Sequence, residues 1–296
     1  MATRNKKITG EKWARLRGAA RWLAARTRSG VAAVGIRGFL LLAIAAGSVW
    51  GIELARHHVG QMRAFRVYPE RFRAEGPAWC AQDLANVEFP RDSYSIFDPR
   101  LIRDVTEAYR ACPWVASVQR VEKRLPNELR VELTLREPAA FVRQPSGYCA
   151  VDAEGVYLPL DYSHWDHPQQ PLATISGVAI PPPAPGRLWA DRRVGAALSV
   201  LAALGTEPEV MRCVSVVDVA NLDGEVDPMR SEVVLFTHRN VRIFWGRPAD
   251  TRKFGEPTVA EKLARLRRCM ARHRSLAGAG TLIDLRFPDQ EAVARQ

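Results

Sequence analysis

The chain has 296 residues, 47% of them hydrophobic, a formal net charge of +11 and a sequence pI of about 9.9. This length leaves room for two small domains, each with its own core. Residues 1–37 hold ten Lys and Arg side chains against one acid, so they carry +9 and the remaining 259 residues carry only +2. A folded nucleic-acid-binding surface would need its basic residues on the body of the protein, and the composition therefore argues against that class.

An uncharged stretch follows the basic tail. Gly38–Ile52 has fifteen residues without a charge. Extended upstream past Arg37, the stretch reaches about 22–24 residues, which is enough to cross a membrane. We expect a basic cytoplasmic tail (1–30), then a transmembrane helix (31–54) with the N-terminus inside and the remainder of the chain outside. A buried core helix and a cleaved signal peptide are the alternatives, and the long basic tail favours an uncleaved anchor.

The next segment has the pattern of a small α+β module. After a linker expected at residues 55–64, residues 65–74 predict a strand that Pro69 bends or places at a sheet edge. Residues 77–85 predict a short helix. A second, amphipathic helix is expected up to Pro113, with Asp98 as its cap and Pro99 in its first position.

The clearest signal in the chain is a β-hairpin. From Leu129 to Leu135 every second residue is apolar, as in a strand with one face on a core and one in water. In the preceding strand Val118 and Val121 are three residues apart, so both face the core only if one residue bulges out. Pro126-Asn127 supplies the turn between the two strands. Residues 64–137 therefore predict the order β-α-α-β-β.

After Pro138 the pattern changes to short strands with two helices. Strands are expected at residues 140–143, 148–151, 156–158, 213–219, 232–237, 241–245 and near 281–287. One helix is expected at residues 191–204, and a second begins at the capping box Thr258–Glu261. The second helix should bury Val259, Leu263, Leu266, Cys269 and Met270 and expose Lys262, Arg265, Arg268 and Arg272. Residues 159–185 are proline-rich and are expected to form a loop.

The sequence contains no common catalytic motif, so we expect no enzyme activity, cofactor or metal. The best metal-like cluster is Asp161, His164, Asp166 and His167, which we interpret as a solvated loop because the ligands crowd into seven residues. The acidic segment from Asp218 to Asp227 lacks the spacing of a calcium loop and is interpreted as a turn. The five cysteines are expected to be free, with a Cys80–Cys112 or Cys112–Cys149 bridge as the alternative.

These motifs in this order resemble a known family. SIFD, a helix, PWV, a strand, LPNEL, a strand and REPAAFV resemble the POTRA domain of the bacterial cell-division family FtsQ, also called DivIB. The turn Asp152–Gly155, the hairpin with Asn240 and Gly246-Arg247, and the strand Asp284–Phe287 resemble the β domain of that family. The resemblance implies an α+β protein with one N-terminal transmembrane helix, a βααββ POTRA domain (62–137) and a larger, mostly antiparallel β domain (138–296) with flanking helices.

The resemblance also implies a function. FtsQ relatives are non-enzymatic, single-pass scaffolds at the division septum, and the last strands of their β domain receive the small single-pass proteins FtsB and FtsL. Strand addition at an open sheet edge is the physical basis of such binding. The family's last strand falls here on residues 290–294. The implied partner-binding residues are Phe287, Gln290, Glu291, Ala292 and Val293, flanked by Arg265, Arg268 and Arg272.

Two other classes stay open. A POTRA-containing protein-export or outer-membrane assembly component would need tandem POTRA repeats or a long series of barrel strands, and the sequence has neither. A membrane-anchored enzyme would have to use the loop 161–167.

Overall fold

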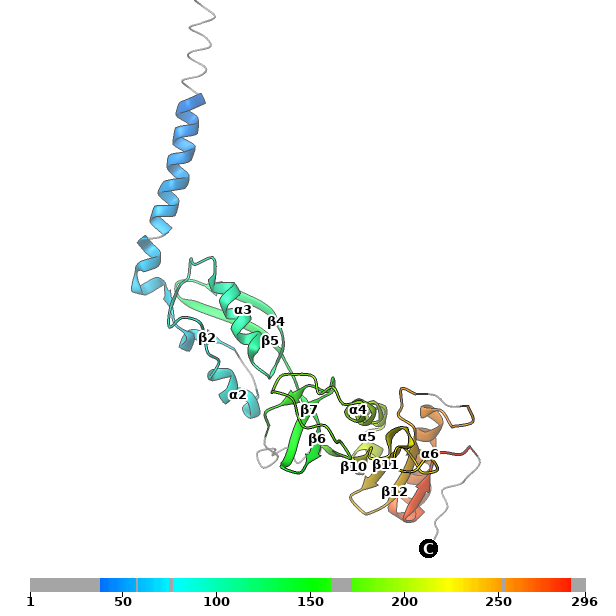
Figure 1. Ribbon diagram of the computed structural model, residues 1–296. Helices are drawn as coiled ribbons and strands as arrows, with labels where there is room; N and C mark the ends of the chain where they lie inside the picture. Colours follow the sequence, from blue (N-terminus) through cyan, green and yellow to red (C-terminus); the bar gives the residue numbers. More distant parts are fainter. Residues whose placement is uncertain (1–37, 57, 75–76, 161–171, 252–253, 289–296) are drawn as a thin grey trace, which may run out of the picture. The chain divides into compact units, whose positions relative to one another are not determined.

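The computed structural model describes residues 38–288, except 57, 75–76, 161–171 and 252–253 (Figure 1). It is a mixed α+β protein, as the sequence predicts. The chain divides into two compact units: residues up to Arg66 together with Ser95–Asp98, and Val67–Tyr94 together with Pro99 onwards. Each unit is described by itself below.

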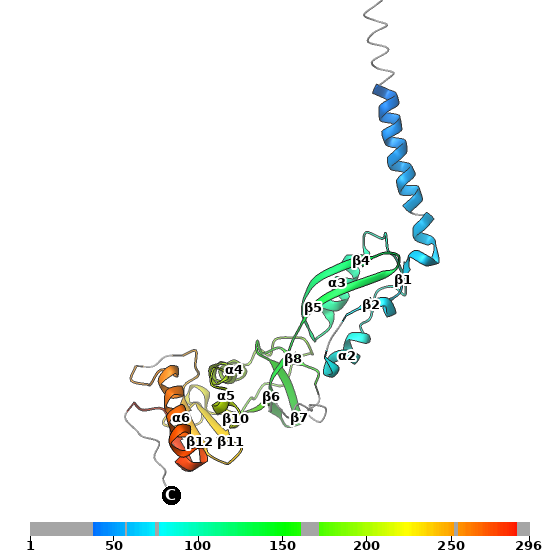
Figure 2. The same ribbon diagram turned by 180° about the vertical axis from the view of Figure 1, so that it is seen from behind.

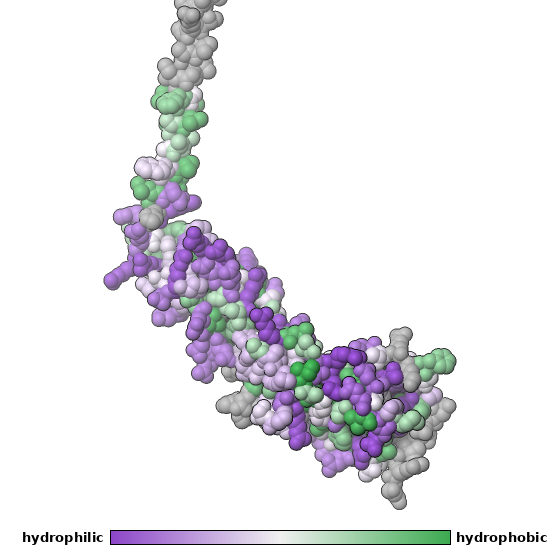
Figure 3. All heavy atoms as spheres, viewed as in Figure 1, coloured by the Kyte–Doolittle hydropathy of each residue, from purple (hydrophilic) through white to green (hydrophobic). Residues whose placement is uncertain are grey.

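The first unit contains a long apolar helix, Gly38–Gln61, which is long and apolar enough to cross a membrane. Figure 3 shows hydrophobic residues on this helix. The linker expected at residues 55–64 is wrong in its first part, because the helix runs on to Gln61. Residues 31–37 of the expected span lie outside the described residues. Past the short 3-10 helix η1 (Arg63–Phe65), the Ile96 N–H donates to the Phe65 carbonyl at 3.0 Å, and the rings of Phe65 and Phe97 lie 5.5 Å apart.

The first part of the second unit contains the two helices and the hairpin of the predicted β-α-α-β-β order, with a short strand, β3, between the helices that the sequence did not predict. Its three-stranded sheet has the order β2-β5-β4 (Figures 1 and 2). The elements of this part of the chain are β1 (Arg66–Val67), η2 (Pro69–Arg71), β2 (Phe72–Arg73), α2 (Ala78–Ala85), β3 (Tyr94–Ser95), α3 (Leu101–Ala111), β4 (Val115–Arg124) and β5 (Glu128–Leu135). Arg66 of β1 and Ser95 of β3 are counted in the first unit. Pro69 starts a 3-10 turn, which divides the expected first strand into β1 and β2. The short strands β1 and β3 pair with each other.

The predicted bulge is confirmed in the β4–β5 hairpin. Val118 pairs with Leu133 and Arg120 pairs with Glu132, which leaves Gln119 as the extra residue. The alternation in β5 is also confirmed, because its apolar residues are the more buried ones. Because of this extra residue, Val118 and Val121 lie on the same face of the sheet although they are three residues apart.

The start of α3 differs from the prediction. Arg100 is the N-cap and makes no side-chain capping bond, so Asp98 and Pro99 do not start the helix. The reason is local: the Asp98 N–H donates to the Ser95 carbonyl at 2.9 Å, which places Asp98 in a turn before the helix. Ile102, expected on the buried stripe, is 41% exposed.

The larger part of the second unit is built on an eight-stranded sheet in the order β13-β12-β11-β10-β9-β6-β7-β8. The strands are β6 (Pro138–Gln144), β7 (Gly147–Asp152), β8 (Tyr157–Leu158), β9 (Ala173–Ser176), β10 (Val214–Asp218), β11 (Val233–Thr237), β12 (Arg242–Gly246) and β13 (Leu282–Asp284). Four neighbouring pairs are antiparallel and three are parallel. β9 lies where the sequence predicted a loop. Four residues among prolines carry little strand signal, and parallel pairing with β6 on one side and β10 on the other makes the segment a strand.

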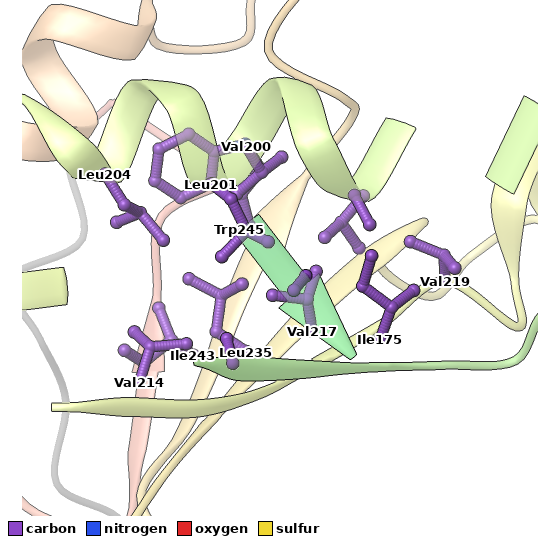
Figure 4. Packing of buried hydrophobic residues seen from close by; sticks show 14 of the residues in the cluster. Ile175, Val200, Leu201, Leu204, Val214, Val217, Val219, Leu235, Ile243 and Trp245 are labelled. Atoms are coloured by element: carbon purple, nitrogen blue, oxygen red, sulfur yellow. The ribbon is translucent and has the colours of Figure 1, made fainter. Parts of the chain in front are cut away.

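Helices cover one face of this sheet. They are α4 (Arg192–Gly205), α5 (Pro208–Met211) and α6 (Val259–His273), with 3-10 turns η4 (Leu222–Gly224) and η5 (Ala277–Ala279). Figure 4 shows the α4 side chains Val200, Leu201 and Leu204 above Leu235 and Trp245 of the sheet. α4 ends at Gly205, one residue later than predicted. The Thr258–Glu261 capping box at the start of α6 is confirmed.

The expected exposure of Lys262 is wrong. The side chain is only 3% exposed, its Nζ lies 2.6 Å from Glu256 Oε1, and it sits over the Trp245 ring at 5.1 Å. Lys262 lies beside Leu263 and four residues before Leu266, on the edge of an apolar stripe that is wider than the sequence pattern indicated. Burial lowers the pKa of Lys262, and the Glu256 carboxylate opposes that shift.

The last residue of β12, Gly246, has to be a glycine for two reasons. Its φ is 98°, and a Cβ there would collide with Glu256 Oε1. The same carboxylate oxygen accepts the Arg247 N–H at 3.0 Å. Only a residue without a side chain lets Glu256 reach both the backbone and Lys262.

A second buried cluster joins the smaller sheet to the larger one within this unit. It contains Trp114 and Leu84 on one side and Phe141 and Leu158 on the other. At the connection between the two sheets, Arg136 Nη1 lies 2.6 Å from Asp152 Oδ2. The two modules therefore share a core, and the boundary at residues 137 and 138 stays a prediction.

We expect Glu256→Gln to lower the free energy of unfolding by about 3 kcal/mol, because it leaves the buried Lys262 ammonium without its counter-charge. The measurement is chemical denaturation of the full chain in detergent, with unfolding monitored by tryptophan fluorescence. Glu225→Gln is the matched control, since Glu225 pairs with Arg193 at the surface with 58% of its side chain exposed. Its cost should stay below about 1 kcal/mol. Equal losses for the two variants would contradict the importance of the buried pair.

Candidate protein-binding edge

The two edge strands of the eight-stranded sheet, β8 and β13, have different surroundings. At the β8 end a loop covers the strand: the Tyr157 N–H donates to the Arg187 carbonyl at 3.0 Å, and the Gly186 N–H donates to the Tyr157 carbonyl at 2.8 Å. Val156 also bridges to Leu188. At the other end, β13 is the last strand among the residues that the structure describes. The β13 end is therefore the candidate for binding another chain.

The backbone of β13 shows which groups face outward. The Arg242 N–H donates to the Thr281 carbonyl, and the Leu285 N–H donates to the Phe244 carbonyl, each at 2.9 Å. In a parallel pair alternate residues bond to the same neighbour, so the backbone groups of Leu282 and Asp284 point to the outer edge. The buried side chains Ile283 and Leu285 hold the strand to the core. Among the residues that the structure describes, the result is an anchored strand with an open side.

Arg286 and Phe287, which follow β13, form an aromatic and basic surface. The Arg286 guanidinium binds Asp284, with Nη2 2.8 Å from Oδ2, and it lies over the rings of Phe244 and Phe287 at 5.1 and 5.2 Å. The hydrogen bonds to Asp284 raise the pKa of Arg286. Phe287 stays 48% exposed, and Arg265 Nη1 of α6 donates to its carbonyl at 2.6 Å. Asp284 and Arg265 therefore hold Arg286 and Phe287 in place beside the edge.

A shallow cleft of about 250 Å³ opens next to this surface. Its lining residues come from the β11 and β12 ends and from two loops: Pro228, Met229, Arg230, Ser231, Glu232, Gly246, Arg247, Phe254, Gly255, Glu256, Arg286 and Phe287. Met229 is 84% exposed, and Phe254 is fully exposed. Sequence reasoning missed both, because a single apolar residue in a loop carries no periodic signal.

The basic residues of the cleft are already paired. Arg230 lies 3.0 Å from Asp227, and Arg247 lies 3.2 Å from Glu232. With Arg286 bound to Asp284, the three guanidinium groups of the cleft all have carboxylate partners. Exposed apolar groups and the open strand edge, rather than free cations, are what this surface offers to a partner.

The predicted site residues are only partly brought together. Arg265 and Phe287 are in contact, whereas Arg268 and Arg272 are exposed on α6. Residues 290–293 of the predicted strip lie outside the described residues, as does the whole Asp161–His167 cluster. The described ranges contain no group of three or more His, Cys, Asp or Glu side chains that could hold a metal ion. In the acidic segment, Asp218 accepts the Ala220 N–H as in a turn.

Comparison with known proteins gives a partial similarity. No family model matches the chain. A 43-residue segment, 14% of the chain, is 49% identical to the cell division protein FtsQ of Corynebacterium glutamicum. The matched segment spans 19% of the length of that relative. The similarity to a cell division protein therefore covers a small part of each chain.

Proposed function

We propose that this protein is a single-pass membrane scaffold of the bacterial cell-division machinery, at the septum, with its N-terminus in the cytoplasm. It acts without catalysis, by binding other division proteins outside the cytoplasmic membrane. The apolar helix Gly38–Gln61 and the partial similarity to FtsQ support this proposal. Residues 62–137 are its POTRA domain and residues 138–296 its β domain.

The open edge of β13 is the observation that carries the binding function. The backbone of Leu282 and Asp284 offers hydrogen bonds to an added strand, each worth about 0.5–1.5 kcal/mol net. Such bonds alone do not select a partner, because every extended chain can make them. Exposed aromatic groups next to the edge supply the selectivity, and Phe287 and Phe254 are in that position.

The partner class comes from the resemblance to the FtsQ family, because an open edge by itself accepts any extended segment. FtsQ relatives receive small single-pass proteins on the last strands of their β domain. We therefore propose FtsB- and FtsL-like division proteins as partners. The strip Phe287, Gln290, Glu291, Ala292 and Val293 forms the contact, with Arg265, Arg268 and Arg272 of α6 beside it.

We expect Phe287→Ala, alone or with Phe254→Ala, to weaken binding of an FtsB-like partner at least tenfold, or about 1.4 kcal/mol, because these exposed rings act as anchors. Binding is measured with the full chain in detergent and the co-purified partner. Leu188→Ala is the matched control, since Leu188 is 61% exposed at the covered end of the same sheet. All three variants should unfold at the wild-type temperature. Equal affinity for Phe287→Ala and Leu188→Ala would overturn the choice of the β13 end.

We expect Val293→Pro to abolish partner binding, because proline has no N–H to donate to an added strand. Deletion of residues 288–296 should have the same effect. Val293→Ala keeps the backbone N–H and should bind within a few-fold of wild type. A pull-down in which Val293→Pro still retains the partner would rule out strand pairing at the predicted strip.

We expect opposite compartments for the two ends of the chain. A β-lactamase fused after residue 296 should confer ampicillin resistance, since that enzyme acts outside the cytoplasm, and a fusion before residue 1 should not. The basic tail of residues 1–37 is the reason, through the positive-inside rule. Resistance from the N-terminal fusion would contradict the proposed topology.

A further inference from the structure

We propose that Cys80 and Cys112 form a disulfide when the folding chain meets an oxidising compartment. This modification rests on the extracytoplasmic location proposed above. In the structure both thiols are free. Their place in the fold makes them the pair that oxidation would join.

One hydrogen bond holds the two cysteine-bearing segments together. Trp114 Nε1 donates to Asp83 Oδ2 at 2.5 Å, which ties α2 to the turn between α3 and β4. Cys80 lies three residues before Asp83 in α2, so the two side chains share one face of that helix. Cys112 lies two residues before Trp114. The bond therefore brings the Cys80 face of α2 against the segment that carries Cys112.

Membership of a different buried cluster separates this pair from Cys149. Cys80 is 1% and Cys112 is 8% exposed, and both belong to the cluster around Trp114. Cys149 belongs to the other buried cluster, on the α4 side of the larger sheet. The structure therefore favours Cys80–Cys112 over the Cys112–Cys149 alternative.

The electrostatics of the two thiols agree with this proximity. Burial raises the pKa of Cys80 to about 11, and the nearby Cys112 and Asp83 add to the shift. Burial also raises the pKa of Cys112, with Asp83 adding again. These shifts lower the fraction of thiolate, which is the reactive form, once α2 has packed. The bridge therefore forms while the chain folds, before the cluster closes.

The chemistry is a dithiol oxidation by exchange. The thiolate of one cysteine attacks the disulfide of an oxidising dithiol–disulfide protein, and the second cysteine then displaces that protein from the mixed disulfide. The chain loses two protons and two electrons and gains one S–S bond, and the oxidant leaves as a dithiol. The new bond closes a loop of roughly 33 residues, which restricts the unfolded chain. It fastens α2 to the core shared by the two sheets.

The test counts free thiols in the full chain. Cells are lysed directly into denaturant that contains N-ethylmaleimide, so that buried free thiols are blocked as well, and the purified chain is then reduced and labelled with a heavy maleimide. Two labels are expected for wild type and for Cys149→Ala, and none for Cys80→Ala or Cys112→Ala. Peptide mapping of the unreduced wild type should show the Cys80 and Cys112 peptides linked, and this readout does not depend on how well the variants fold. The oxidised chain should also unfold several degrees higher than the reduced chain.

A second experiment tests the Cys80–Cys112 pairing independently of the compartment in which the chain folds. The purified full chain is unfolded, reduced and refolded in a glutathione redox buffer, and its thiols are counted in the same way. A Cys80–Cys112 bridge in the buffer but five blocked thiols in cells supports the pair and contradicts the extracytoplasmic placement. Five free thiols in both arms, or a bridge that Cys149→Ala removes, overturns the proposal.

Discussion

The parallel pairing of β13 with β12 is the constraint on which the candidate binding edge depends. Parallel neighbours need a crossover connection, and α6 supplies it between the two strands. α6 buries Leu263 and Leu266 in the core, so the helix and the strand after it are fixed together. The last described strand is thereby held at the end of the sheet, with its inner side bonded and its outer side open.

The same helix places a charge in the core. The Glu256 carboxylate forms an ion pair with Lys262 and also accepts a hydrogen bond from the Arg247 N–H, just after Gly246. One carboxylate thus joins α6, the end of β12 and the loop before α6. A buried pair of this kind contributes little net stability compared with apolar side chains, but removing one partner is costly. The pair thus connects α6 with the end of β12, where Gly246, Arg247 and Glu256 line the cleft.

The junction between the two modules is built in a different way. Trp114 is fully buried between α2 and the larger sheet, and its indole N–H is bound by Asp83. The Arg136–Asp152 ion pair crosses the same connection. The smaller and larger sheets are therefore connected through packed side chains.

Much of the fold could be predicted from local patterns. The alternation in β5 and the three-residue spacing of Val118 and Val121 predicted the hairpin and its bulge, because side-chain period defines which face is buried. The Thr258–Glu261 capping box and the apolar helix near the N-terminus were equally local. For the site, the family resemblance pointed to Phe287 and Arg265, which the structure places in contact. The binding role of the strip stays a prediction.

Contacts distant in sequence decided the rest. β9 is a strand because β6 and β10 flank it, and Lys262 is buried because Glu256 lies opposite. Met229 and Phe254 gain importance only where two loops meet beside β13. The sequence by itself determined the periodicity of each element, because each residue's neighbours along the chain set it. Only the tertiary structure decided the strand order, the open edge and the partners of buried charges, because these depend on packing between segments that the sequence keeps far apart.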